Sequence, residues 1–207
     1  MEGDFLSKIR MVGTSFLGIK ILEKFINMDS FNTETIAIAT HHLDYSHSSA
    51  KIKIDIGRGE RFGLDGGSPQ RSEKLAMRCH DEILEALDGS EIVLGITDLG
   101  DDDGEGIPPV IAEISKEIGA LSIFLTFIPF GMVPHRQRKA QDFLEKIIDK
   151  SDNVIKIEME YFFKIIPPKT PLMTAFNMIE HFIAEDLIYI LKCYNKLKFI
   201  NSSALML

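Results

Sequence analysis

The chain has 207 residues, of which 45% are hydrophobic and 26% are charged, and its formal net charge is −8. This length and balance predict a globular domain with a proper core, and they exclude disordered and collagen-like chains. An acidic surface repels other polyanions, so we expect no nucleic-acid partner.

The sequence shows neither the pattern of a secretory signal nor the cysteine spacing of a structural metal site. The first residues are acidic where a secretory signal would be basic, and the two cysteines, Cys79 and Cys193, form no C-x-x-C pair. No run of about 18 apolar residues occurs, which predicts no transmembrane segment. We therefore expect a cytoplasmic protein.

Segments typical of strands alternate with segments typical of helices. The predicted strands are residues 9–12, 35–39, 51–56, 92–96, 121–126 and 154–157. The predicted helices are residues 16–26, 72–87, 108–118, 136–148 and a long helix from 171 onward. This alternation predicts an α/β fold, a doubly wound and mostly parallel sheet flanked by helices, as in Rossmann-like proteins. Its ligand is expected beyond the carboxyl ends of the strands.

Several motifs resemble those of the FtsZ/tubulin family. Gly66-Gly67-Ser68-Pro69 resembles the G-G-N-P motif of FtsZ, residues 109–121 resemble the segment after the family's signature loop, and residues 171–176 resemble the start of its central helix. The chain is therefore identified as a divergent FtsZ-like member of this family. The resemblance implies a GTPase domain over residues 1–170 and a central helix over 171–207, in one structural domain without the family's C-terminal domain.

The signature loop departs from the family pattern. In the family its backbone N–H groups wrap the nucleotide phosphates, but the matching residues 100–106 carry four carboxylates. Two like charges about 4 Å apart repel by about 4 kcal/mol at the dielectric of a protein surface. Since micromolar binding amounts to about 8 kcal/mol, we expect weak or lost GTP binding and no resident cofactor.

The resemblance nevertheless assigns residues to the nucleotide site. They are Gly13, Gly18, Gly66, Gly67, Gly104 and Gly106 at the phosphates, Arg136 or Arg138 as the arginine, and Glu180 as the base-reading carboxylate. The family's catalytic loop corresponds to residues 201–206, where both of its aspartates are missing. Without a carboxylate to orient the attacking water, we expect no catalytic residue and no GTP hydrolysis.

The acidic loop leaves two interpretations open. Asp101, Asp103 and Glu105 offer the hard oxygen ligands that Mg²⁺ or Ca²⁺ prefers, although their spacing fits no calcium-loop template. The alternative is a solvated acidic loop at a helix N-terminus, where the helix dipole favours negative charge.

The function implied by the resemblance is that of a cytoskeletal, cell-division-related protein that acts through association. Without a second domain, part of the central helix would expose apolar side chains and form a partner surface, for a second copy or for an FtsZ filament that the chain regulates or caps. The expected side chains are drawn from Phe182, Ile183, Leu187, Ile190, Leu191, Tyr194 and Phe199. The alternative function is a GTP- or GDP-binding switch or slow GTPase, with Mg²⁺ held by the acidic loop.

Overall fold

The computed structural model describes residues 8–29, 31, 33–41, 46–60, 68–129 and 134–204. Six strands form one sheet in the order β3-β2-β1-β4-β5-β6, and every neighbouring pair is parallel. The strands are β1 (Ile9–Thr14), β2 (Glu34–Ala39), β3 (Ile52–Asp55), β4 (Ile92–Asp98), β5 (Leu121–Ile128) and β6 (Asn153–Glu158). The predicted doubly wound sheet is confirmed.

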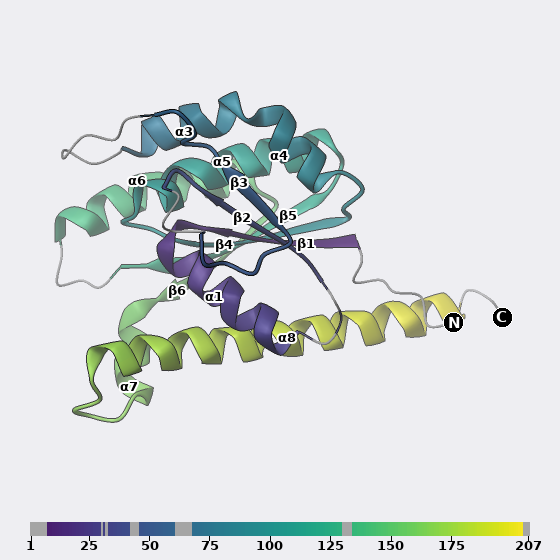
Figure 1. The fold of residues 1–207 in the computed structure, drawn as a ribbon. Coiled ribbons are helices and arrows are strands. Elements are labelled where there is room, and N and C mark those ends of the chain that lie inside the picture. Colours follow the sequence, from purple (N-terminus) through teal and green to yellow (C-terminus); the bar gives the residue numbers. More distant parts are fainter. Residues whose placement is uncertain are drawn as a thin grey trace.

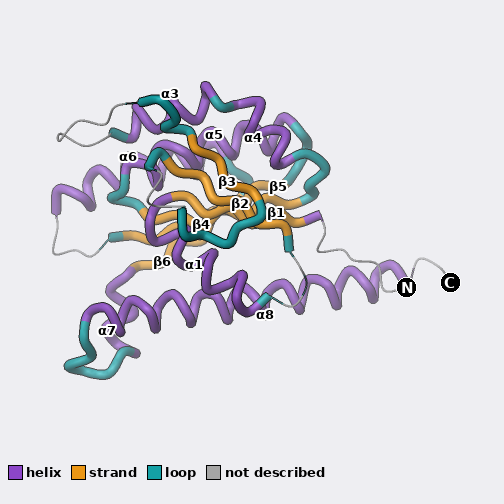
Figure 2. The backbone as a smooth tube through the Cα atoms, viewed as in Figure 1, coloured by secondary structure: helices purple, strands orange, loops and turns teal. Residues whose placement is uncertain are grey.

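Helices cover both faces of this sheet (Figure 1). They are α1 (Ser15–Met28), α3 (Pro69–Arg78), α4 (His80–Leu87), α5 (Asp102–Glu117), α6 (Pro134–Lys150), the 3-10 turn η2 (Met159–Tyr161), α7 (Phe162–Ile165) and α8 (Leu172–Ala204). α3, α4, α5 and α6 lie on one face, and α1 with the long α8 lies on the other, so that the strands run between two helical layers (Figures 1 and 2).

Two apolar cores follow from the alternation of side chains along each strand. Met11 of β1 packs in the core that α1 and α8 share, whereas its neighbour Val12 packs in the core beneath α3, α4, α5 and α6. Both side chains are fully buried. Successive strand residues point to opposite faces, so a sheet covered on both sides needs apolar residues at consecutive positions.

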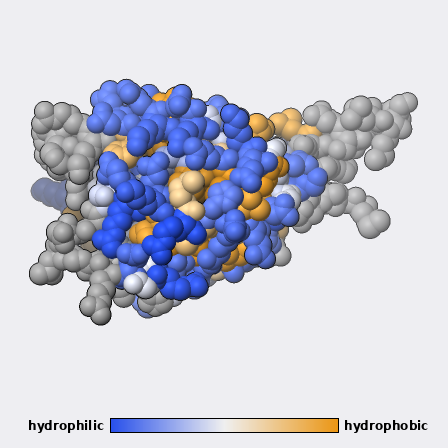
Figure 3. Space-filling view, turned by 90° about the horizontal axis from the view of Figure 1, so that it is seen from above, coloured by the Kyte–Doolittle hydropathy of each residue, from blue (hydrophilic) through white to orange (hydrophobic). Residues whose placement is uncertain are grey.

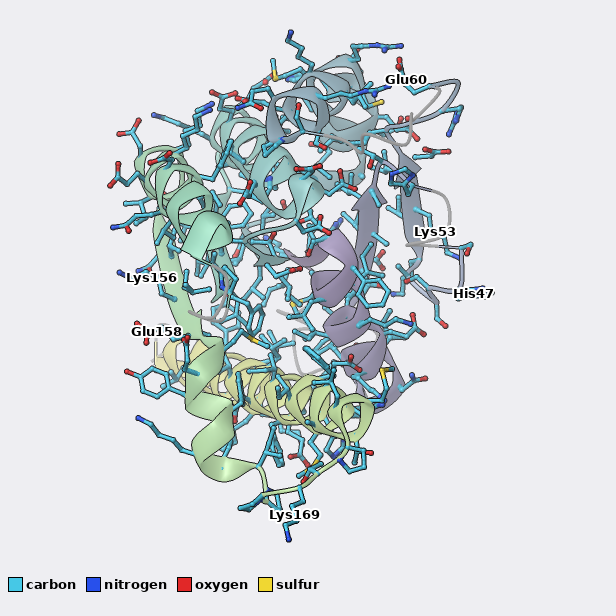
Figure 4. The ribbon with its side chains drawn as sticks, turned by 90° about the vertical axis from the view of Figure 1, so that its left-hand side faces the viewer. His47, Lys53, Glu60, Lys156, Glu158 and Lys169 are labelled. Carbon is cyan, nitrogen blue, oxygen red and sulfur yellow. The ribbon has the colours of Figure 1, made fainter. Side chains whose placement is uncertain are left out.

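The two edges of the sheet carry lysines. Lys53 on β3 and Lys156 on β6 stand on opposite sides of the molecule when it is viewed from the left of Figure 1 (Figure 4), and both side chains are exposed. A charged side chain on an edge strand opposes pairing with another sheet. Seen from above, the outer side of the α3–α6 layer is largely hydrophilic, with smaller apolar areas (Figure 3).

Helix α5 begins six residues earlier than the sequence predicts, at Asp102 instead of Pro108. The acidic residues of the predicted loop therefore belong to its first turns. Pro108 has no N–H to donate to the Gly104 carbonyl one turn earlier, but Thr97 Oγ1 donates to that oxygen at 2.9 Å. This substitute hydrogen bond satisfies the carbonyl that Pro108 leaves without a donor inside the helix.

Helix 72–87 is likewise divided by a break at Cys79, between α3 and α4. Within the described ranges, none of the helices is long and apolar enough to span a lipid bilayer.

Candidate functional site

The strand order reverses between β1 and β4, the two neighbours at the centre of the sheet. From β1 the chain passes into α1 and on to β2 at one side, and from β4 it passes into α5 and on to β5 at the other. Ligands of doubly wound folds bind at such a point, where the N-termini of two helices present free backbone N–H groups. The carboxyl edge of the sheet, which contains this point, faces the viewer in Figure 4.

The N-terminus of α1 is occupied by a carboxylate of the chain itself. Ser15 Oγ donates a hydrogen bond to Asp98 Oδ1, and the backbone N–H of Leu17 donates to the same carboxylate. The N–H of Gly18 donates to Ser15 Oγ at 3.3 Å. Ser15 holds this position with a φ of +69°, a left-handed conformation that serine adopts only at a cost. The donors that begin α1 are thus directed at Asp98 and Ser15.

Asp98 titrates far from its usual range. Burial raises its pKa from 3.8 to about 7, and the charge of Asp101 adds to this rise. The hydrogen bonds from Ser15 and Leu17 favour the charged form but do not outweigh burial.

The N-terminus of α5 is capped by Asp101. Its Oδ1 accepts from the N–H of Asp103 at 3.0 Å and from the N–H of Gly104 at 3.3 Å. Burial raises the pKa of Asp101, and the nearby Asp103 charge raises it further, while the two backbone hydrogen bonds oppose both. A side chain of the chain therefore satisfies the amides at the start of this helix as well.

Asp103 joins three segments that are distant in the sequence. Its Oδ2 accepts from the N–H and the hydroxyl of Thr40 at 2.8 and 2.9 Å, and its Oδ1 accepts from Ser72 Oγ at 2.8 Å. Thr40 directly follows β2, and Ser72 lies in the first turn of α3. With only 4% of its surface exposed, Asp103 is a buried link between β2, α3 and α5.

Glu105 completes this set of internal carboxylates. It is 2% exposed, and its Oε1 accepts from the N–H of Gly100 at 2.9 Å. The prediction of a solvated acidic loop is therefore wrong for Asp103 and Glu105, because both are buried within the first turns of α5. The sequence pattern does not show that Thr40, Ser72 and Gly100 supply donors to them.

The proposed metal ligands Asp101, Asp103 and Glu105 are each hydrogen-bonded to different protein groups. In the part of the chain that the structure describes, no group of three or more His, Cys, Asp or Glu side chains is placed to hold a metal ion. The metal hypothesis thus stays a prediction.

Two of the predicted phosphate-binding glycines have a clear packing role. A Cβ at Gly18 would lie 2.2 Å from the Ile96 carbonyl oxygen, and one at Gly104 would lie 1.8 Å from the Asp98 carbonyl oxygen. The absence of a side chain lets α1 and α5 approach the end of β4. Their retention therefore has a structural reason that is independent of any phosphate.

Of the other predicted residues, some are described by the structure and some are not. Gly13 is in β1 and Gly106 is in α5 against the start of α3. Gly66 and Gly67 lie outside the described residues. Arg136 and Arg138 fall in α6, with their side chains outside the described part. Residues 201–204, which the resemblance assigns to the family's catalytic loop, continue α8, and their side chains lie outside the described part.

Glu180 lines a cavity between α1, α8 and the end of β4. The cavity has a volume of about 740 Å³, and its wall includes Asp98 and Asp101 as well as Glu180. Glu180 is only 8% exposed. Burial raises its pKa, although Lys24 and Lys20 lower it. The structure thus brings Glu180 and the start of the acidic loop to one cavity, and the role of Glu180 in base recognition stays a prediction.

The comparison with known proteins agrees with this geometry. A family model described as the Tubulin/FtsZ family, GTPase domain, matches residues 18–167. Cell division protein FtsZ 1 of Methanocaldococcus jannaschii is 33% identical over 176 residues, which cover 84% of this chain and 48% of that protein. FtsZ 1 of Pyrococcus horikoshii is 30% identical over 181 residues, or 86% of this chain and 48% of that protein. The chain spans about half the length of the curated relatives it matches.

Solved structures show the same likeness in three dimensions. An empty FtsZ dimer from M. jannaschii matches with a TM-score of 0.79 at 30% identity, covering 88% of this chain and 53% of that chain. CetZ2 from Haloferax volcanii, solved as a GTPγS-bound protofilament, matches with a TM-score of 0.76 at 17% identity, covering 91% of this chain and 59% of that chain. At that identity the second match speaks for the fold alone.

Proposed function

The chain belongs to the Tubulin/FtsZ family, and from that premise we propose that it is a divergent cytoskeletal member whose GTP binding and hydrolysis are weak or lost. It acts through association with other proteins, in the cytoplasm and in connection with cell division.

One observation carries this proposal: the donors at the switch point are already bound to carboxylates. Asp98 takes the hydrogen bonds at the start of α1, Asp101 those at the start of α5, and Asp103 those of Thr40 and Ser72. A phosphate can accept hydrogen bonds only from donors that are free or released. The carboxylates fill the role that phosphate oxygens have at helix N-termini in other doubly wound proteins.

Electrostatics opposes a triphosphate in the same place. Asp98 and Asp101 border the cavity next to the two helix N-termini. A phosphate charge about 4 Å from one carboxylate loses about 4 kcal/mol at an effective dielectric of 20. Above about pH 7, where Asp98 is ionised as well as Asp101, two such contacts offset about 8 kcal/mol, which is the whole of a micromolar affinity.

Isothermal titration with GTP and excess Mg²⁺ tests the loss of binding. We expect no binding tighter than about 10 μM. Because both aspartates of the family's catalytic loop are missing from residues 201–206, we also expect no measurable turnover of GTP. The control is a filament-forming FtsZ titrated in the same buffer. A dissociation constant below 10 μM for this chain would refute the proposal.

The surface that we propose for association is the outer face of α8, formed by Tyr189, Ile190 and Leu197. Their side chains are 69%, 49% and 61% exposed. The predicted face needs correction at three positions: Ile183, Leu187 and Leu191 are at most 5% exposed, because they pack in the core that α8 shares with α1. Ile190 is exposed as predicted.

The remaining predicted members of that face differ in their outcome. Phe182 and Tyr194 are partly buried, and the side chain of Phe199 lies outside the described residues. The empty FtsZ of M. jannaschii was solved as a dimer, which supports a second copy as one partner. An FtsZ filament, regulated or capped by this chain, is the other.

Sedimentation distinguishes these two partners, because self-association of the chain alone indicates a second copy and co-sedimentation with FtsZ filaments indicates a filament. The variant Ile190→Glu tests the outer face of α8, and Ile148→Glu on α6 is a matched control, because the two isoleucines are 49% and 48% exposed. We expect Ile190→Glu alone to weaken self-association, or co-sedimentation with FtsZ filaments, by at least tenfold. Equal effects of both variants, or a monomer that ignores filaments, would contradict the proposal.

A second candidate function is a GTP- or GDP-binding switch with Mg²⁺ at Asp101, Asp103 and Glu105. The observation that favours it is the cavity, whose wall includes Glu180, the residue that the resemblance implies for base recognition. This candidate requires the carboxylates of Asp101, Asp103 and Glu105 to give up their present hydrogen bonds so that their oxygens can bind the ion. Tight, Mg²⁺-dependent binding in the GTP titration would support the switch.

A further inference from the structure

We propose that the cavity between α1 and α8 binds a small aromatic molecule that carries a cationic nitrogen and no phosphate. This inference deepens the proposed function and rests on it in one respect, because the carboxylates that take the place of phosphate also border the cavity.

The wall of the cavity is suited to a flat apolar body. Most of its apolar residues come from α1, β5, η2 and α8, and they include three phenylalanines and two methionines. These are Phe16, Phe127, Phe176, Met159 and Met173. A volume of about 740 Å³ is within the range of small-molecule sites. Phenylalanine faces and methionine sulfur pack well against aromatic rings.

Glu180 marks where a cation would bind. More than nine-tenths of this residue is buried, and its carboxylate borders the cavity. Among the residues that the structure describes, no donor forms a hydrogen bond with it and no lysine pairs with it within 4 Å. A buried carboxylate without a partner is costly, so a ligand that supplies an N–H or a positive charge gains the energy of satisfying it.

The other charged groups of the wall have partners of their own. Lys24 Nζ donates to Asn177 Oδ1 at 3.2 Å, and Lys20 Nζ lies 5.4 Å from the centre of the Phe16 ring. Glu23 accepts from the N–H of Ser49 at 2.7 Å. The two lysines are thus engaged at the α1 side of the cavity.

The acidic residues at the end of β4 determine which charge on a ligand the cavity favours. Asp98 and Asp101 border the cavity in addition to Glu180 and Glu23, so four carboxylates face two ammonium groups. At pH 8, above the pKa of about 7 that Asp98 has, these charges give the cavity a negative potential, which repels an anionic ligand and attracts a cation. A cation in the cavity would stabilise the charged forms of Asp98 and Glu180, which burial disfavours.

Three probes of the same shape and different charge test whether the cavity prefers a cation. Naphthalene-2-carboxamidine, naphthalene-2-carboxamide and naphthalene-2-carboxylate share a bicyclic ring and carry charges of +1, 0 and −1 at neutral pH. The chain contains no tryptophan, so naphthalene fluorescence reports binding without overlap from indole. At pH 8 we expect the amidine to bind at least tenfold more tightly than the amide, and the carboxylate to bind most weakly.

Variants locate the site. Glu180→Gln is expected to weaken amidine binding about tenfold while the amide changes less than threefold. Glu185→Gln is the matched control, because it removes the same charge from an exposed position on the same helix, and it should leave both affinities unchanged. Circular dichroism verifies that each variant is folded.

The outcomes separate this inference from the proposed function. Amidine binding without GTP binding supports both, and binding of GTP together with the amidine contradicts only the proposed function. Binding of neither, or equal affinity for the three probes, overturns only the present inference. Binding of GTP with no amidine preference overturns both.

Discussion

Replacing Asp98 by asparagine should remove a pH dependence of stability that the internal carboxylate creates. The side-chain oxygen of asparagine can still accept the hydrogen bond from Ser15, so the change mainly removes a charge. In the folded protein the pKa of Asp98 is about 7 because of burial, whereas its ordinary value is 3.8. The folded state therefore holds a proton that the unfolded state has lost, and the free energy of unfolding falls as the pH rises from about 4 to about 7.

The size of this fall follows from the two pKa values. Each pH step over which only the unfolded state is ionised lowers the free energy of unfolding by about 1.4 kcal/mol. Between pH 5 and pH 8 the loss is about 3 kcal/mol, since the folded-state pKa is about 7. That is a large part of the 5 to 15 kcal/mol that typically stabilises a domain. The asparagine variant should lack this loss and be more stable than the parent at pH 8.

Urea denaturation followed by circular dichroism at pH 5, 6, 7 and 8 measures the effect as the difference between variant and parent. Asp142→Asn is the control, because it removes the same charge from an exposed position on α6. Its difference from the parent should stay within about 0.5 kcal/mol at every pH. The reasoning fails if the Asp98→Asn difference is independent of pH, or if the parent becomes the more stable protein at pH 8.

Three further substitutions test the same site by urea denaturation. Ser15→Gly should be more stable than Ser15→Ala by about 1 kcal/mol, because a φ of +69° costs glycine nothing and strains alanine. This is the reverse of the usual order of the two residues in helices, and finding the usual order would argue against backbone strain at Ser15. Asp103→Ala should lower the free energy of unfolding by about 3 kcal/mol, because it leaves the donors of Thr40 and Ser72 buried without their acceptor. A loss below about 1 kcal/mol would mean that water takes the place of the carboxylate. Gly104→Ala should lower the free energy of unfolding by about 2 to 3 kcal/mol, since the added Cβ would lie 1.8 Å from the Asp98 carbonyl oxygen. An unchanged free energy of unfolding would show that α5 can shift to make room for the methyl group.

Much of the fold is legible in the sequence because it depends on local periodicity. All six strands and most helices occur where the alternation of apolar residues predicts them. The boundaries differ where a tertiary contact intervenes. Helix α5 continues from Asp102 through Pro108 because Thr97, in β4, donates to the Gly104 carbonyl that Pro108 leaves without a hydrogen bond. No pattern within the helix sequence contains that contact.

The candidate site, like the fold, was predicted from the sequence only in part. The sequence places four carboxylates between Gly100 and Gly106 and thereby predicts a repulsive environment for phosphate. It also predicts that Glu180 belongs to the site, and the structure places Glu180 in the wall of the cavity that Asp98 and Asp101 border. It does not predict that Asp103 is buried, because its three donors come from Thr40 and Ser72.

The sequence by itself determined the order of the elements, the acidic character of the loop after β4 and the family of the chain. Only the tertiary structure decided where each carboxylate goes, which side of α8 remains exposed and which cavity survives. The physical reason is distance along the chain: periodicity and charge are properties of neighbouring residues, whereas Thr40, Ser72 and Asp103 meet only after the parallel strands have aligned their carboxyl ends.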